Sequence, residues 1–237
     1  MNVRQALYIR TIAEEKGVTA AAKKLKKGDT LIVLGDFGFV WDGSAAEKKR
    51  LQKLGKKKYT VAFLDGRHEN YDLLAAYPES DWNGGRVQTI VGNIVHLLRG
   101  EIYTIEGKTF LTIGGGESPD HDIRMHAGTF FEQEMPTAAD MENAMTHLRA
   151  ADNTVDYILT HEPSGKANGY FSLGTPTSGI NLLFNPLEET VNFPRWYFGC
   201  LHLDRAMSSR HRAVFEDIVP VEELWKARNG KHVRKKK

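Results

Sequence analysis

The stretch that decides the fold is residues 27–39, with the sequence KGDTLIVLGDFGF. Within it, Thr30–Leu34 (TLIVL) is an almost uninterrupted apolar run of strand length, which is typical of a strand buried on both faces. The run stops at Gly35 and Asp36, where small and polar residues begin. Such a strand needs other strands beside it and further elements over both of its faces. The stretch therefore indicates an α/β protein.

Similar apolar runs recur along the chain, and each one ends in a polar segment. They lie at 59–64 (YTVAFL), 155–159 (VDYIL) and 196–198 (WYF). Shorter runs predict further strands at 94–98, 101–105, 109–113, 211–215 and 218–221, and helical spacing predicts helices at 44–54, 71–76 and 137–150. Strands and helices alternate in the first part, and strands dominate the second. This order predicts an α/β fold with mixed β-sheets layered between helices.

The composition fits one globular domain. The 237 residues are 41% hydrophobic, and the formal net charge of +2 neither demands nor excludes a nucleic-acid partner. Basic residues gather at 23–27, 56–58 and 231–237, which we interpret as solvated faces and a frayed tail; non-specific attraction to phosphate is the alternative. The single cysteine cannot form an intrachain disulfide, and no apolar run approaches the ~20 residues of a membrane span. We therefore expect a soluble, cytoplasmic protein without a membrane partner.

Four predicted strand ends carry residues that can bind a metal ion or move a proton. These residues are Asp36, His68, His161, and the pair Cys200 and His202. Ligand sites of open α/β sheets lie beyond the carboxyl ends of the strands, so we expect these side chains to converge on one site. Carboxylate and imidazole suit Mn, Zn or Fe ions. A carboxylate can also bridge two metal ions, and a nearby histidine can protonate a leaving oxygen.

The order of these residues resembles the calcineurin-like metallophosphoesterases. That family carries five motifs: D-x-H, G-D-x-x, G-N-H-[DE], a lone His after a strand, and G-H-x-H. From about residue 26 to 221, this chain matches the second motif with Gly35 and Asp36, and the fourth with Thr160 and His161. Residues 66–69 (GRHE) match the third and residues 199–202 (GCLH) the fifth, each except at its second position. Residues 41–43, 82–85 and 131–134 also resemble a bacterial and phage subgroup.

The resemblance implies a role for each matched residue. Asp36 would bridge two divalent metal ions, His161 and Cys200 would bind the second ion, and His202 would bind the first. His68 would act as general acid or transition-state stabiliser, with Arg67 as a second candidate catalytic residue. We also assign Arg67 and Asn70 to substrate binding, because they could hold an anionic phosphate without a metal. The expected substrate is a phosphate ester.

Three departures predict an incomplete metal site. No D-x-H precedes Asp36, and we find no counterpart of the family's first strand before Thr30. Arg67 stands at an Asn position and cannot ligate a metal because it has donors only; it could pair with Asp36 or hold a phosphate. Cys200 replaces a histidine, and its thiolate could bind zinc or the thiol could bind nothing. Only one metal ion, or none, would then be held.

Residues 1–25 resemble the start of a LysR-type transcription regulator, an incomplete helix-turn-helix with helices at 4–15 and 20–27. An ordinary amphipathic helix pair is the alternative, and we expect no sequence-specific DNA binding because the recognition helix is missing.

We divide the chain into this segment (1–25), a phosphoesterase domain (26–222) and a basic tail (223–237). A missing central strand would expose sheet edges, which predicts self-association; an upstream start or a partner's strand could instead restore D-x-H.

Three functions follow from these observations, in decreasing order of support. The first is a metal-dependent phosphoesterase that hydrolyses phosphate mono- or diesters, with activity impaired by its incomplete two-metal site. The alternative is a catalytically inactive protein of the same fold that binds a phosphate-containing ligand. A DNA-binding regulator built on the first 25 residues is the weakest interpretation.

Overall fold

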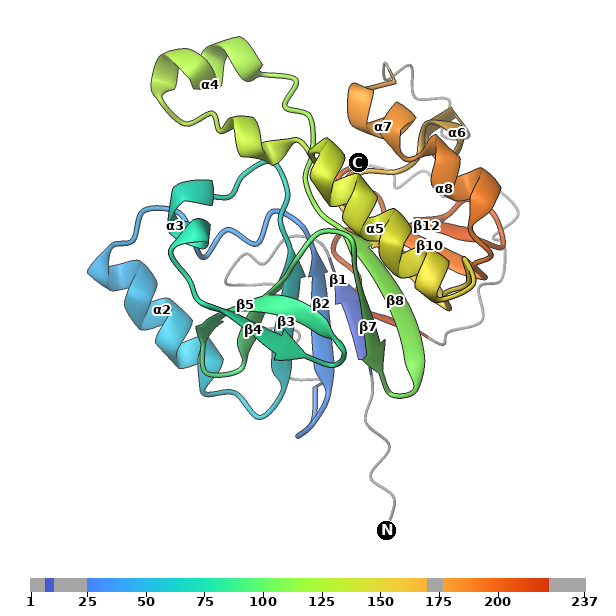
Figure 1. Cartoon of the computed structure of the whole chain (residues 1–237). Coiled ribbons are helices and arrows are strands. Elements are labelled where there is room, and N and C mark those ends of the chain that lie inside the picture. The colour runs from blue at the N-terminus through green and yellow to red at the C-terminus, as the bar shows by residue number, and fades with distance from the viewer. Residues whose placement is uncertain (1–6, 11–24, 170–176, 222–237) are drawn as a thin grey trace, which may run out of the picture.

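The computed structural model describes residues 7–10, 25–169 and 177–221, the first of these by their backbone alone. Two mixed sheets face each other, and helices cover their outer faces (Figure 1). The first sheet has the order β13-β1-β2-β3-β6-β5-β4 and the second the order β11-β12-β10-β9-β8-β7. The expected α/β architecture with mixed sheets between helices is confirmed.

The bounds of the elements follow the chain. The first sheet contains β1 (Leu7–Arg10), β2 (Thr30–Leu34), β3 (Thr60–Leu64), β4 (Glu79–Trp82), β5 (Gly85–Val91), β6 (Ile94–Leu97) and β13 (Val219–Pro220). The second contains β7 (Glu101–Ile105), β8 (Lys108–Ile113), β9 (Tyr157–Thr160), β10 (Arg195–Phe198), β11 (Arg205–Ala206) and β12 (His211–Ala213). The helices are α2 (Ala45–Gly55), α3 (Tyr71–Ala75), α4 (His121–Ala127), the 3-10 turn η1 (Glu132–Glu134), α5 (Ala138–Ala150), α6 (Gly165–Gly169), α7 (Gly179–Leu183) and α8 (Asn185–Thr190).

β1 corrects two expectations about the start of the chain. It pairs in parallel with β2, with Leu7 opposite Thr30, and antiparallel with β13. The helix expected at 4–15 is therefore wrong at residues 7–10, and the strand thought to be missing before Thr30 is present. The physical reason is that β2 is buried on both faces and needs a hydrogen-bonding neighbour on this side, and the apolar pair Leu7 and Ile9 also fits the two-residue period of a strand.

The structure tests only part of the expected helix-turn-helix. Residues 11–24, which carry the expected helix-turn-helix, lie outside the described residues. Residues 25–27 are described and are not helical, so the second helix does not extend to Lys27. Because β1 pairs with β2, no sheet edge is exposed at that place, and self-association stays a prediction.

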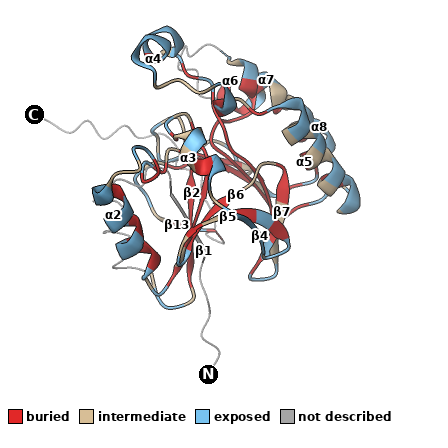
Figure 2. Cartoon of the chain, turned by 60° about the vertical axis from the view of Figure 1, so that its left-hand side comes forward, coloured by how far each residue is buried: buried red, intermediate tan, exposed pale blue. Residues whose placement is uncertain are grey.

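Three apolar layers hold the sheets and helices together. The layer between the sheets includes Ile32 and Leu34 of β2 and Tyr197 of β10, whose hydroxyl donates to the carbonyl of Val221 (2.9 Å). A second layer joins the first sheet to α2 and α3, and a third joins the second sheet to α5–α8. Figure 2 shows the buried strands at the centre of these layers. Successive side chains of a strand point to opposite faces of its sheet, so each central strand packs into two layers. This explains the apolar runs in the sequence.

Local signals explain most helix and turn positions. Ser44 caps α2, and Thr137 with Asp140 forms a capping box on α5, as the predicted helix starts require. The β4–β5 hairpin was not predicted, although it turns at Asn83 and Gly84, which both have positive φ. Within the described residues, α4, α6, α7 and α8 were also not predicted, because their apolar patterns are too short to show a period.

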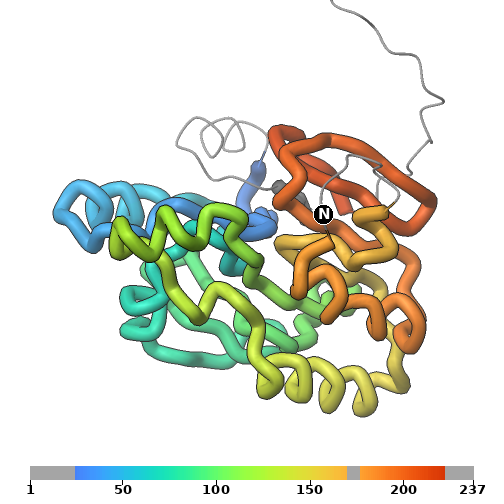
Figure 3. Tube along the Cα trace, turned by 90° about the horizontal axis from the view of Figure 1, so that it is seen from above, coloured from blue at the N-terminus to red at the C-terminus, as the bar shows by residue number. Residues whose placement is uncertain are grey.

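The topology brings four strand ends to one side of the molecule. β2 and β3 are parallel in the first sheet, and β9 and β10 are parallel in the second. The two pairs meet where His161, directly after β9, donates from Nδ1 to the carbonyl of Leu34 at the end of β2 (2.8 Å). Figure 3 shows the molecule from above, with the first part of the chain (blue to green) on the left and the last part (orange to red) on the right. The expected convergence is therefore present for the ends of β2 and β9.

Candidate functional site

Asp36 stands at the centre of the candidate site, directly after β2. Its φ of 52° is left-handed, a conformation that aspartate tolerates better than most residues. Its Oδ1 accepts hydrogen bonds from the backbone N–H groups of Arg67 (2.8 Å) and His68 (3.0 Å). A Cβ at position 66 would lie 2.4 Å from this oxygen, so Gly66 is required for the approach. The loop after β3 thus folds around the Asp36 carboxylate.

The surroundings keep Asp36 ionised. Burial by itself would raise the pKa of this carboxyl, but the nearby His161 and His68 more than offset burial and hold the pKa below its usual range. The side chain of His68 contributes through Nδ1, which lies 3.1 Å from Asp36 Oδ2. A carboxylate with charge-assisted contacts from two sides is therefore available in the site.

His161 lies on the other side of Asp36 and is fully buried. Its Nδ1 donates to the carbonyl of Leu34, which fixes the orientation of the ring and turns Nε2 toward Asp36. That Nε2 has no hydrogen-bond partner and lies 3.7 Å from Asp36 Oδ2. A Cβ at position 35 would come within 2.2 Å of the imidazole, so Gly35 makes the close approach possible. The arrangement leaves one buried ring nitrogen facing one carboxylate oxygen.

Arg67 presents its guanidinium to the site without a protein counter-ion. Among the described residues, no carboxylate lies within ion-pair distance of it, and its Nε is buried with no hydrogen-bond partner. The alternative in which the Arg67 side chain pairs with Asp36 is therefore not found; only its backbone N–H contacts Asp36. The side chain passes over Gly116, where a Cβ would lie 2.5 Å from Arg67 Cγ. An unpaired, partly buried cation is thus held near His68 and Cys200, and its charge lowers the pKa of both side chains.

His68 is the most accessible of these residues, with about half of its side chain exposed (54%). Its hydrogen bond to Asp36 raises the pKa of the imidazole, while burial and the cations Arg124 and Arg67 lower it, and the net shift is upward. Its Nε2 makes no hydrogen bond within the part of the chain that the structure describes. A donor with a raised pKa is therefore free to meet a ligand.

Glu69 has a structural role that the sequence motif did not reveal. Its buried carboxylate accepts from the N–H of Phe37 (2.6 Å) and from the N–H of Gly66 (2.9 Å), and so joins the loops after β2 and β3. Burial raises the pKa of this carboxyl, and the nearby Asp36 raises it further. The signal that could have identified this role is an acidic residue three positions after Gly66, the glycine that follows the end of β3.

Asn70 extends the same connection. Its Nδ2 donates to the carbonyl of Trp41 (2.7 Å), and its Oδ1 accepts from the N–H of Leu73 at the start of α3. Both ends of the amide are therefore engaged in holding the loops. The assignment of Asn70 to substrate binding stays a prediction.

Cys200 and His202 both follow β10, but only Cys200 lies beside His161. The N–H of Cys200 donates to the carbonyl of His161 (2.9 Å), which places it beside that residue. Burial raises the pKa of the thiol, and Glu162 and Asp36 add to the increase although Arg67 opposes it. His202 is exposed and stacks on the ring of Phe215, with centroids 4.7 Å apart. No hydrogen bond or ion pair within the described residues joins His202 to Asp36 or His161.

The comparison with protein families decides the ancestry. The family model described as calcineurin-like phosphoesterase matches residues 8–202, which begin inside β1 and include every candidate site residue. The chain belongs to the calcineurin-like phosphoesterase family. A search of curated proteins found no match. Membership supports a phosphoesterase-type function with phosphate esters as substrates, and the family is typically metal-dependent.

The donor set of this calcineurin-like phosphoesterase does not fit a two-metal centre. Asp36 and the free Nε2 of His161 face each other, but no group of three or more histidine, cysteine, aspartate or glutamate side chains could hold an ion among residues 7–10, 25–169 and 177–221. Arg67, a permanent cation whose backbone N–H contacts Asp36, has no atom that can ligate a metal ion. Within the same residues, no helix is long and apolar enough to cross a membrane.

Proposed function

We propose that this chain binds phosphate mono- or diesters at a site formed by Asp36, Arg67, His68 and His161, and that its hydrolytic activity is impaired. The observation that carries the proposal is the buried Nε of Arg67, which has no partner and belongs to a guanidinium without a counter-ion. A buried donor of this kind costs free energy unless a ligand satisfies it. Arginine binds phosphate oxygens through two parallel N–H···O bonds, which suits the position.

Each residue contributes a distinct interaction in this proposal. Arg67 holds the phosphate oxygens, and His68, whose pKa is raised, donates a hydrogen bond to an ester oxygen. Asp36 does not contact the phosphate, because two anions would repel each other. It holds the backbone of residues 67 and 68 and keeps His68 oriented. Glu69 fixes the same loop from behind.

Metal-dependent hydrolysis of the same esters is the second candidate function. It is favoured by one observation: His161 Nε2, which has no hydrogen-bond partner, lies 3.7 Å from Asp36 Oδ2. Those two residues, with Cys200 beside them, are the ones that would hold a single Mn, Zn or Fe ion. Such an ion would supply a Lewis acid and an activated water.

The two candidates are distinguished by binding measured with and without metal. In the presence of a chelator, titration calorimetry with p-nitrophenyl phosphate is expected to show binding, and Arg67→Ala is expected to weaken it more than tenfold, as loss of a charge-assisted contact implies. Arg149→Ala is the matched control, because Arg149 is an exposed arginine on α5 that pairs only with residues of that helix. Binding that needs metal and ignores Arg67→Ala would contradict the first proposal.

Turnover tests the second candidate. Purified protein is analysed for metal content, and hydrolysis of bis-p-nitrophenyl phosphate is followed with added Mn²⁺. Slow turnover that disappears in Asp36→Asn and His161→Ala supports a single-ion enzyme. Fast turnover with two equivalents of tightly bound metal contradicts the proposed impairment.

A further inference from the structure

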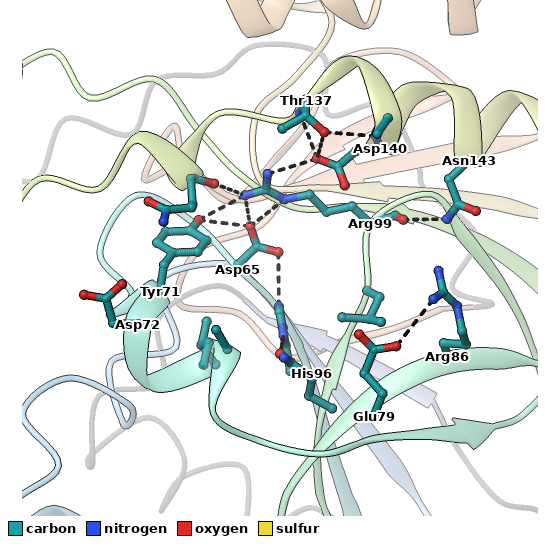
Figure 4. Close-up of a pocket in the computed structure, with 16 residues that line it drawn as sticks. Asp65, Tyr71, Asp72, Glu79, Arg86, His96, Arg99, Thr137, Asp140 and Asn143 are labelled. Atoms are coloured by element: carbon teal, nitrogen blue, oxygen red, sulfur yellow. Dashed lines mark hydrogen bonds and ion pairs between the residues drawn. The ribbon is translucent and has the colours of Figure 1, made fainter.

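A cavity of about 610 Å³ lies apart from the residues of the proposed phosphate site. Its walls come from α3, β4, β5, β6, η1 and α5, and Figure 4 shows the side chains around it. None of Asp36, Arg67, His68 and His161 lines it. The volume is in the range of small-molecule sites, which is roughly 300–1,000 Å³. The cavity is therefore a candidate for a second, independent ligand.

The cations of the cavity are already neutralised. Arg99 is nearly buried and donates to Asp65, to the hydroxyl of Tyr71 and to three backbone carbonyls of residues 133–135. The Nε and Nη2 of Arg86 donate to Glu101 Oε1, and its Nη1 lies 3.4 Å from Glu79. Arg99 is 10% exposed, and the half-exposed Arg86 has a carboxylate on each of two sides, Glu101 and Glu79. The cavity is consequently less suited to an anion than to a cation.

The carboxylates of the cavity are not neutralised to the same extent. Asp72, in the first turn of α3, makes no hydrogen bond or ion pair within the described residues. Asp140 uses Oδ2 for Thr137 and Arg99, and its Oδ1 makes no hydrogen bond to a described residue. Glu79 has only the long contact to Arg86, and both side chains are about half exposed. Four lining carboxylates against two guanidiniums leave two negative charges.

The distribution of these charges selects the kind of cation. Asp72, Glu79 and Asp140 come from three separate elements around the cavity (Figure 4). They do not converge on a point, since no group of three such side chains among the described residues could hold a metal ion. The wall between them is partly apolar and includes Leu74, Ala75, Leu98 and Ala139. An extended ligand with separated positive charges and an apolar body matches this surface.

We propose that the cavity binds a linear aliphatic amine with two or more ammonium groups. The methylene chain lies against the apolar wall, where its burial is favourable. The ammonium groups donate to Asp72, Glu79 and the free oxygen of Asp140. The ligand contacts no residue of the phosphate site, so its binding does not depend on the function proposed above.

Calorimetry with the full chain and spermidine at 150 mM sodium chloride tests the proposal. We expect saturable binding of one amine per chain. Asp72→Asn and Glu79→Gln are each expected to weaken it roughly two- to fivefold, which is the size of a partly exposed ion pair, and together about tenfold. Butylamine, which has one ammonium group, is expected to bind at least tenfold more weakly than spermidine. The absence of saturable binding at this salt concentration overturns the proposal.

Two further variants separate the cavity from general attraction to acidic surface. Ala75→Trp fills an exposed position of the wall and is expected to abolish binding, while Glu142→Gln removes an exposed carboxylate of α5 that does not line the cavity and is expected to change nothing. Thermal melts confirm that each variant is folded. Equal affinity in the Ala75→Trp, Glu142→Gln and Asp72→Asn/Glu79→Gln proteins places the amine elsewhere and overturns the proposal.

Discussion

Asp65 and Arg67 are two residues apart, and their surroundings differ in kind. Asp65 is buried, and its two oxygens contact Arg99, Tyr71 and His96. Arg67 has a guanidinium without a counter-ion and a buried Nε without a hydrogen bond. In a network that only stabilises the fold, every buried polar group has a hydrogen-bond partner, as around Asp65. A ligand site leaves donors without a protein partner, as at Arg67 Nε. Gly66 therefore separates a residue of the structural network from a residue of the candidate ligand site.

The largest expected effect concerns the structural side of this comparison. Asp65→Asn leaves the Arg99 cation buried without its main counter-charge and should reduce the free energy of unfolding by about 3–5 kcal/mol. Urea unfolding at pH 7 measures this loss. Asp36→Asn is the comparison on the ligand side: its amide oxygen can still accept from the N–H groups of residues 67 and 68, so it should cost less than Asp65→Asn, about 1–2 kcal/mol. Equal losses in the two variants would show that Asp36 and Asp65 contribute equally to stability.

The same pair predicts a dependence on pH. Burial would raise the pKa of Asp65, but Arg99 and His96 more than offset burial and hold the pKa well below its usual range. A carboxyl with a lowered pKa in the folded state stabilises the fold above its unfolded pKa, about 3.9, and loses this contribution as the pH falls below that value. Unfolding free energies measured from pH 6 to pH 3 should therefore fall more steeply in the unmodified chain than in Asp65→Asn. Parallel curves would contradict this assignment.

A smaller loss is expected at the residue that connects the two loops. Glu69→Ala leaves the N–H groups of Phe37 and Gly66 without their acceptor, which should cost roughly 2–4 kcal/mol, and should weaken phosphate binding more than tenfold because the loop carrying Arg67 is released. Glu69→Gln keeps one acceptor oxygen and should lie between the two proteins in both measurements. Urea unfolding and calorimetry with p-nitrophenyl phosphate give the two values. Unchanged phosphate affinity in Glu69→Ala would show that Glu69 stabilises the fold and has no role in phosphate binding.

The smallest effect is expected at His202. Because its side chain is exposed and only stacks on Phe215, His202→Ala should change stability by less than about 0.5 kcal/mol and leave metal content and phosphate affinity unchanged. The family pattern assigns a metal ligand to this position. Loss of bound metal in His202→Ala would therefore show that the loop after β10 joins the site in solution.

Patterns of hydrophobic residues were sufficient for the strands that matter most. Thr30–Leu34 is β2 with the expected bounds, and the predicted helix starts at Ser44 and Thr137 are confirmed as caps. The four-residue strand β1 was misassigned because Leu7–Arg10 fits both a helical and an alternating pattern, and the deciding contact, the edge of β2, is distant in sequence. The β4–β5 hairpin was overlooked despite its Asn83-Gly84 turn.

The candidate site was predicted in part. The meeting of Asp36 with His68 and His161 follows from parallel strands ending on one side. The separate position of His202 does not follow from sequence, because the backbone at that residue turns left-handed (φ 50°) and the ring packs on Phe215. The sequence also did not show that Glu69 and Asn70 hold loops together. Their partners are backbone groups, which every residue has, so no residue type marks them.

The sequence alone determined the α/β class, the family, and the residue types that stand at the strand ends, because hydrophobic periodicity and short ordered motifs are local properties. It also determined that no D-x-H precedes Asp36 and that position 67 is a cation. Only the tertiary structure decided which of those side chains meet, that a strand lies beside β2, and that a cavity with excess negative charge forms between α3 and α5. These features depend on contacts between segments that are far apart in the chain, and each contact is stable only when the surrounding packing has formed.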